Sequence, residues 1–84
     1  MYDLYFTVRS VTPGQKGREA LTRAGCPCRL IRAPRAVAPN GCAYALTLRR
    51  EDGVRALAVL QKAGVRTEGC YLARADGEFE RVGP

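Results

Sequence analysis

The chain has no histidine and no tryptophan, and only eight acidic residues against fourteen basic ones among its 84 residues. Without histidine it lacks the usual general base of nucleophilic catalysis and the commonest metal ligand. It also lacks a phosphate-binding loop, because residues 14–17 are too few and do not end in Gly-Lys-Ser/Thr. No apolar run approaches the roughly 20 residues that cross a bilayer. We therefore expect no stand-alone enzyme, no resident cofactor or metal, and no membrane partner.

What the chain does have is the size of one small domain and a formal net charge of +6. A surface of this sign attracts anions and acidic partners. The N-terminus lacks the basic leader of a secretory signal and reads as a strand, so we expect a cytoplasmic protein. The four cysteines should then be reduced thiols, and the C-x-C spacing of Cys26 and Cys28 differs from the C-x2-C of zinc sites.

Hydrophobic periodicity divides the chain into six elements. Residues 2–9 alternate as a strand with one buried face. Ser10 or Thr12 can cap a helix that runs to residue 24, where Gly25 ends it. Further on, the pattern predicts strands over residues 28–33, 42–48 and 66–73 and a second helix over residues 53–63.

The resulting order, β-α-β-β-α-β, predicts an α+β protein of the ferredoxin-like type. We expect a two-layer sandwich in which a four-stranded antiparallel sheet, order 4-1-3-2, carries both helices on one face. Residues 1–74 should form this single domain. Residues 75–84 are mostly polar, and we expect them to be a loosely held C-terminal tail.

Cys42 is the candidate reactive residue. It follows the connection 34–41, which contains two prolines, an asparagine and a glycine and cannot be a central strand or a helix. The expected topology brings Cys42 to the sheet edge where the first helix begins, and helix N-termini and cations lower a thiol pKa. The residues expected to support the thiolate, through charge, hydrogen bonds or open space, are Ser10, Thr12, Arg32, Arg35 and Gly41.

The other cysteines fit a structural role better. Cys28 and Cys70 fall on strands, where a free cysteine usually acts as a small buried hydrophobe. Cys26 precedes Pro27 at a turn, so its exposure stays open.

Three stretches of sequence resemble a family of small prokaryotic domains described as selenium/sulfur carrier protein-like. These stretches are the opening strand with Ser10-Val-Thr, the helix end Ala20-Leu-x-x-Ala-Gly25, and Pro34-Arg35 with Gly41-Cys42-Ala-Tyr44-Ala-Leu46. The resemblance extends to about residue 73. Family members often carry glycine after the cysteine, where this chain has Ala43. The resemblance implies that Cys42 holds sulfur or selenium as a persulfide or selenosulfide and exchanges it with a donor or acceptor protein.

The alternative is a non-catalytic binding or self-association module that uses the open face of the sheet. Such a face can bind nucleic acid or a small ligand weakly, or pair two copies into a homodimer. Nucleic-acid binding requires exposed aromatics among basic residues. Tyr5 and Arg9 on the first strand fit, but the third strand offers only Ala43, Ala45 and Thr47 on that face. We therefore do not expect nucleic acid as a partner.

Overall fold

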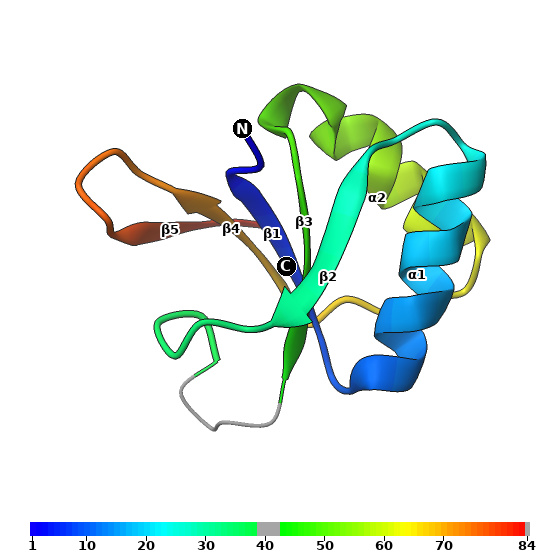
Figure 1. Ribbon diagram of the computed structural model, residues 1–84, viewed down its shortest axis with the longest axis horizontal. Helices are drawn as coiled ribbons and strands as arrows, with labels where there is room; N and C mark the ends of the chain where they lie inside the picture. The colour runs from blue at the N-terminus through cyan, green and yellow to red at the C-terminus, as the bar shows by residue number, and fades with distance from the viewer. Residues whose placement is uncertain (39–42, 84) are drawn as a thin grey trace.

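The structure is a computed structural model that describes residues 1–38 and 43–83. Its elements, in chain order, are β1 (Leu4–Val8), α1 (Val11–Arg23), β2 (Cys28–Arg32), β3 (Tyr44–Leu48), the 3-10 turn η1 (Arg50–Asp52), α2 (Gly53–Lys62), β4 (Gly69–Ala73) and β5 (Phe79–Gly83). The strands form one antiparallel sheet, order β2-β3-β1-β4-β5, and both helices cover the same face of it (Figure 1). The expected α+β class is confirmed.

The core lies between this sheet and the two helices. Along β1 every second side chain points to the helices, and the inward-facing Leu4, Phe6 and Val8 are all buried. Leu21 of α1 and Leu60 of α2 are fully buried against them. In the part of the chain that the structure describes, neither helix is long and apolar enough to cross a membrane.

Two glycines allow α1 to lie close to the sheet. A Cβ atom on Gly14 would come within 2.6 Å of Leu30 Cδ1, and one on Gly17 within 2.7 Å of Leu46 Cδ1. Real Cβ atoms do not approach carbon this closely, so a side chain at either position would push the helix outward. The low helix propensity of these residues is thus offset by closer packing.

The expectation of four strands and a loose tail is wrong, because residues 79–83 form a fifth strand. The turn between β4 and β5 is closed by hydrogen bonds from Arg74 N to Glu78 O (2.8 Å) and from Gly77 N to Arg74 O (3.0 Å). Gly77 has φ of 86°, which only glycine adopts without strain. The expected order 4-1-3-2 therefore lacks β5, which forms one edge of the sheet.

The expected inward face of α2 was also partly wrong. The apolar pattern of residues 53–63 predicts Val54, Leu57, Ala58 and Leu60 as inward positions, but Val54 and Ala58 are exposed, Val54 to 89%. The buried residues are Ala56 and Leu60. The helix begins close to β1, because a Cβ on Gly53 would lie 2.7 Å from Leu4 Cδ2.

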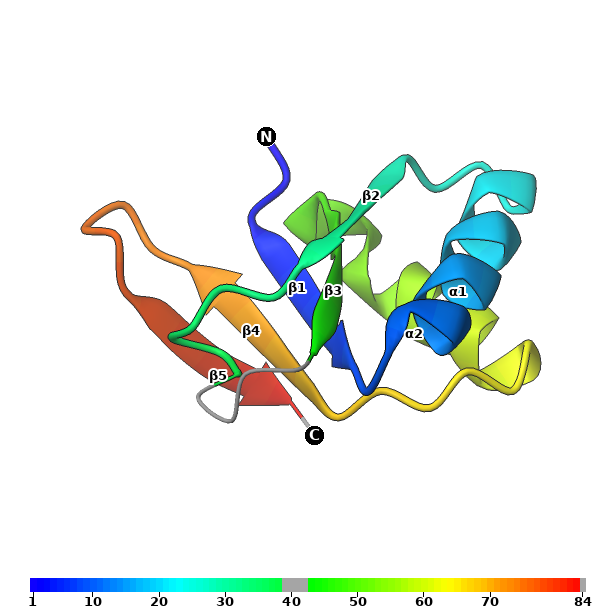
Figure 2. The same ribbon diagram turned by 60° about the horizontal axis from the view of Figure 1, so that its bottom comes forward.

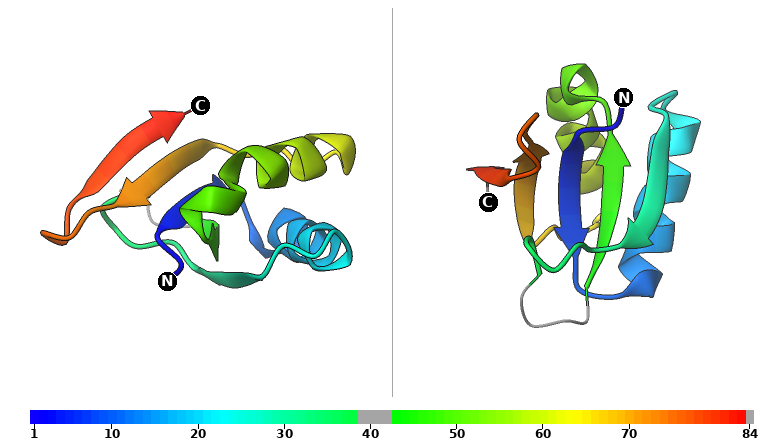
Figure 3. Two further views of the ribbon diagram at one scale, coloured as in Figure 1. Left: turned by 90° about the horizontal axis from the view of Figure 1, so that it is seen from above. Right: turned by 60° about the vertical axis from the view of Figure 1, so that its left-hand side comes forward.

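The segment after β2 crosses the face of the sheet that the helices leave open (Figures 2 and 3). Residues 34–38 fold into turns through hydrogen bonds from Val37 N to Pro34 O (3.0 Å) and from Ala38 N to Arg35 O (3.3 Å). Val37 is only 5% exposed although it does not belong to the core between sheet and helices. Thr7 and Ala45, paired on the open face, are buried as well. The segment thus covers one end of this face.

Asp3 ties the start of β1 to η1. Its carboxylate accepts hydrogen bonds from Arg50 N (3.2 Å) and Arg50 Nε (2.8 Å) and lies 2.7 Å from the Nη2 atom. Partial burial raises the pKa of the Asp3 carboxyl, but the hydrogen bonds and charge of Arg50 outweigh it and hold the pKa below the ordinary value. The ion pair therefore stabilises the fold when the carboxyl is ionised.

We expect Asp3→Asn to lower the free energy of unfolding at pH 7 by about 1 kcal/mol, a modest value because the Arg50 side chain is exposed to water. Because the folded-state pKa is depressed, this difference is complete above the ordinary pKa of 3.8 and disappears as the pH falls through the folded value. Urea unfolding of parent and variant at neutral and acid pH measures it. A difference that persists at acid pH would contradict the assignment.

Candidate functional site

The described residues that flank the predicted reactive thiol lie at one edge of the sheet, where β1 and β2 end and β3 begins. Val8 at the end of β1 and Arg32 at the end of β2 both pair with Tyr44 at the start of β3. Beyond them, Ala33 N donates to Ala43 O at 3.0 Å. The first helix begins at this same edge, the lower one in Figure 1. Gly41 and Cys42 themselves lie outside the described residues.

Ser10 and Thr12 stand at the beginning of α1. Ser10 occupies the N-cap position with extended backbone (φ −154°, ψ 176°), and its carbonyl accepts the first helical hydrogen bond from Gly14 N at 3.3 Å. Its side chain makes no capping hydrogen bond, so the expected side-chain cap is not formed. Ser10 and Thr12 are both exposed. Pro13 has no N–H group, so the first helical turn offers the backbone N–H groups of Val11 and Thr12, which no described side chain caps.

Arg32 and Arg35 both carry exposed side chains, and Arg32, the last residue of β2, lies at this edge. The Arg32 guanidinium carbon lies 5.6 Å from the centroid of the Tyr44 ring, a cation–π arrangement that holds the charge beside the first residue of β3. Arg35 sits in the turn that follows β2. Within residues 1–38 and 43–83, neither arginine forms an ion pair.

Sequence reasoning missed two more cations near this edge. Arg9, Pro13, Arg66 and Glu68 line a hollow of about 220 Å³ where β1 passes into α1. The segment before β4 is joined to β1 there by a hydrogen bond from Glu68 N to Thr7 O at 2.7 Å. The position of Arg9 directly between strand and helix was a usable signal. Arg66 comes from a distant part of the sequence and gave none.

The three described cysteines are free thiols, two of them buried and one half-buried. Cys26, whose exposure the sequence left open, is buried and only 1% exposed. Cys70 is buried and Cys28 is half-buried, and burial raises the pKa of both thiols. A raised pKa keeps a thiol protonated at neutral pH, where it reacts poorly.

Cysteine and carboxylate side chains are also metal ligands. Among residues 1–38 and 43–83, no three His, Cys, Asp or Glu side chains come together closely enough to hold a metal ion.

Comparison with protein families adds an independent observation. The sequence model of the family described as "Putative Se/S carrier protein-like" matches residues 3–72, which is most of the chain. The chain belongs to this family. The matched range of the Se/S carrier protein-like family contains all four cysteines and ends before the β4–β5 turn. No curated protein and no solved structure matches the chain.

Proposed function

We propose that the protein is a thiol-based carrier that holds sulfur or selenium on Cys42 and passes it to a partner protein. The observation that supports this most is that Cys26 and Cys70 are buried and Cys28 is half-buried in a chain of the Se/S carrier protein-like family. The fold shields Cys26 and Cys70 from a donor, and burial raises the pKa of the Cys28 thiol. Cys42 is the cysteine left for the role.

The transfer requires no net oxidation. The Cys42 thiolate attacks the outer sulfur of a donor persulfide, a new S–S bond forms, and the S–S bond of the donor breaks. The donor leaves as a thiolate, and Cys42 then carries the persulfide, which is a reversible cap. A donor selenosulfide reacts in the same way through its selenium atom. Delivery to an acceptor repeats the exchange in the opposite sense.

The charges near the α1 edge favour the thiolate that this step needs. A helix N-terminus carries roughly half a positive charge within its first turn. Arg32 and Arg35 add two permanent charges, the Ser10 hydroxyl makes no capping hydrogen bond, and Thr12 is exposed. Gly41, without a side chain, leaves room for the donor. Together these groups support a lowered pKa at Cys42.

The partners of the carrier are a sulfur or selenium donor and an acceptor, each a protein that must bring its own sulfur atom to Cys42. The excess of fourteen basic over eight acidic residues favours partners with an acidic docking surface. A cytoplasmic location and a homodimer through the open sheet face remain predictions. Residues 33–38 cover one end of that face and reduce the area available to a second copy.

The direct test is to locate the transferred atom. We expect incubation with a cysteine desulfurase and cysteine, or with a selenosulfide donor, to add one sulfur or selenium atom to the protein. Peptide mass spectrometry should find it on the peptide that contains Cys42, and a reductant should remove it. Addition to Cys26, Cys28 or Cys70 with an unmodified Cys42 would contradict the proposal.

A further inference from the structure

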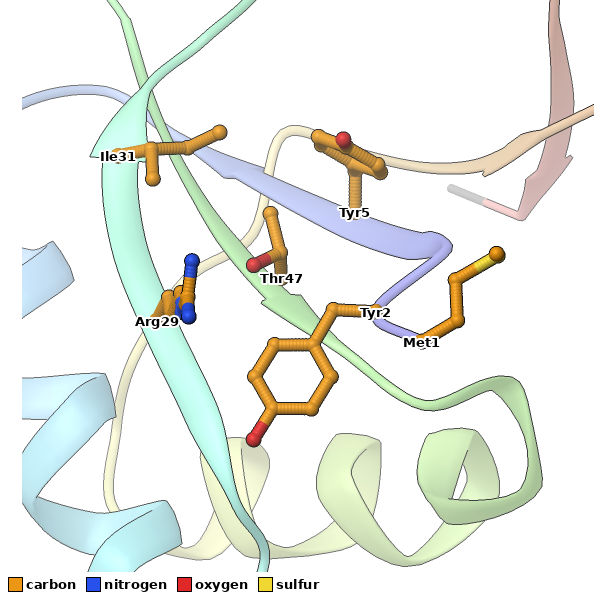
Figure 4. A pocket seen from close by; sticks show the side chains of 6 residues that line it. All are labelled: Met1, Tyr2, Tyr5, Arg29, Ile31 and Thr47. Atoms are coloured by element: carbon orange, nitrogen blue, oxygen red, sulfur yellow. The ribbon is translucent and has the colours of Figure 1, made fainter.

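The open face of the sheet contains a hollow of about 450 Å³ at the end that residues 33–38 do not cover (Figure 4). It lies over β1, β2 and β3, on the side away from the helices. The side chains that line it are Met1, Tyr2, Tyr5, Arg29, Ile31 and Thr47. The set contains two tyrosine rings, the guanidinium of Arg29 and the hydroxyl of Thr47, and no side-chain carboxylate.

Thr47 forms the floor of the hollow and is 3% exposed. Its hydroxyl makes no hydrogen bond to another described residue, whereas the hydroxyl of Thr7 on the same face donates to Gly69 O at 3.3 Å. Figure 4 shows the Thr47 oxygen directed toward Arg29 and the hollow. Because no described residue pairs with this hydroxyl, a ligand atom that enters the hollow can form a hydrogen bond with it.

The walls of the hollow are aromatic rings with an arginine beside them. The Arg29 guanidinium carbon lies 5.8 Å from the Tyr2 ring centroid. Tyr5 stands on the other side of Thr47 in Figure 4, and its ring is held by an edge-on contact with Phe79, 5.0 Å between centroids at 90°. A flat ring entering over Thr47 would meet the rings of Tyr2 and Tyr5. Such walls favour a planar aromatic ligand.

The same surface continues across β4 and β5. Tyr71 pairs with Tyr5 in the sheet register and therefore points to the same face. Arg81 pairs with Tyr71, and its guanidinium carbon lies 5.7 Å from the Tyr71 ring centroid. Arg29 on β2 and Arg81 on β5 thus each lie beside an aromatic ring, on the two outer strands of the sheet. Positive charge interleaved with aromatic rings is the pattern that binds the backbone and bases of a single strand.

We propose that this face binds single-stranded nucleic acid, with one base in the hollow over Thr47 and phosphates further along the strand at Arg29 and Arg81, on the two outer strands of the sheet. The net charge of +6 complements the polyanion, and every base has a face that can stack on Tyr2 or Tyr5. The sequence led to the opposite expectation because the third strand offers no aromatic on this face. The structure supplies the aromatic rings from Tyr2, from β4 and from β5.

Fluorescence anisotropy with a labelled oligouridylate tests the proposal. At about 50 mM salt we expect the parent to bind with a dissociation constant of about 1–100 µM, and to bind more weakly as salt rises. Tyr2→Leu should weaken binding about fivefold or more, because one stacking partner is lost. Tyr2 precedes β1, so the substitution leaves the core intact. A duplex of the same length should compete poorly, since its bases are not available for stacking.

Charge variants separate a specific surface from general attraction. Arg29→Gln should weaken binding and reduce the slope of log affinity against log salt by about 0.7, the loss of one phosphate contact to a single strand. Arg23→Gln removes the same charge from α1, on the helix side, and should leave affinity and slope unchanged. Thr47→Val should weaken binding about two- to tenfold. Its urea midpoint should equal that of the parent, because the hydroxyl has no partner to lose.

Several results would overturn the proposal. The first is no binding by the parent at low salt. The second is an equal loss of affinity in Arg29→Gln and Arg23→Gln, and the third is unchanged affinity in both Tyr2→Leu and Arg29→Gln. The fourth is that a duplex and uridine monophosphate compete as well as the unlabelled single strand does. Cys42→Ser should bind the oligonucleotide like the parent. Loss of sulfur transfer and loss of nucleic-acid binding are therefore distinguishable.

Discussion

The Cys42→Ser variant is expected to take up no sulfur or selenium under conditions that load the parent completely. A serine hydroxyl does not ionise near neutral pH and cannot displace a thiolate from a persulfide, so the initial rate should fall by at least about 100-fold. Intact-mass spectrometry over time measures the rate. We expect this large fall in rate although the variant still contains three thiols, because those of Cys26 and Cys70 are buried and that of Cys28 is half-buried.

Cys28→Ser is the matched control. Cys28 is half-buried and is the most accessible of the three described thiols. Its Sγ lies 4.0 Å from Arg18 O, a weak contact whose loss the fold tolerates. We expect this variant to load at the parental rate. The proposed role of Cys42 would be wrong if Cys42→Ser took up sulfur at the parental rate. It would also be wrong if Cys28→Ser lost as much of that rate as Cys42→Ser does.

The pH dependence of alkylation gives the same distinction without a donor. Burial raises the pKa of Cys28 and Cys70, so both should react slowly at neutral pH and faster only as the pH rises above their ordinary range. Cys42 should react quickly at neutral pH if the positive charges near the α1 edge lower its pKa. Equal rates at all four cysteines in the folded protein would contradict this.

Removal of the residues after Arg74 should destabilise the protein markedly. The truncation deletes β5, its hydrogen bonds to β4 and the edge-on contact between Tyr5 and Phe79. We expect the free energy of unfolding to fall by about 2–4 kcal/mol, measured by urea denaturation. The newly exposed edge of β4 should also promote aggregation.

A single substitution within β5 serves as the control for the truncation. Glu80 is exposed and forms no ion pair with another described residue, so Glu80→Gln should change stability by less than about 0.5 kcal/mol. If the truncated protein were as stable as the parent, residues 75–84 would behave as the loose tail that the sequence suggested.

The strands and helices that the sequence predicted correctly are those with strong periodicity. Alternation in β1 and the Ala-Gly ending of α1 are local signals, and local signals decide element type. β5 was missed because it has few apolar residues. The Asp76-Gly77 pair that precedes it is a strong hairpin signal, and greater weight on turn chemistry would have predicted the fifth strand.

Other features depended on tertiary contacts that no local pattern contains. The face of α2 that turns inward is set by the approach of Gly53 to Leu4, so Val54 was misplaced. Arg66 reaches the α1 edge only because the segment before β4 pairs with β1. The aromatic rings on the open face belong to strands whose order the sequence did not fully predict. Each error follows from contacts between distant segments.

The central place of β1 has a consequence for the order of folding. Leu4 pairs with Leu48 on one side and with Leu72 on the other, so both hydrogen-bonding partners of the first strand come from the second half of the chain. Closing such long loops costs entropy before any contact repays it, which slows folding relative to helical proteins of equal length. An N-terminal fragment ending before β3 therefore has no sheet to join and should remain unfolded.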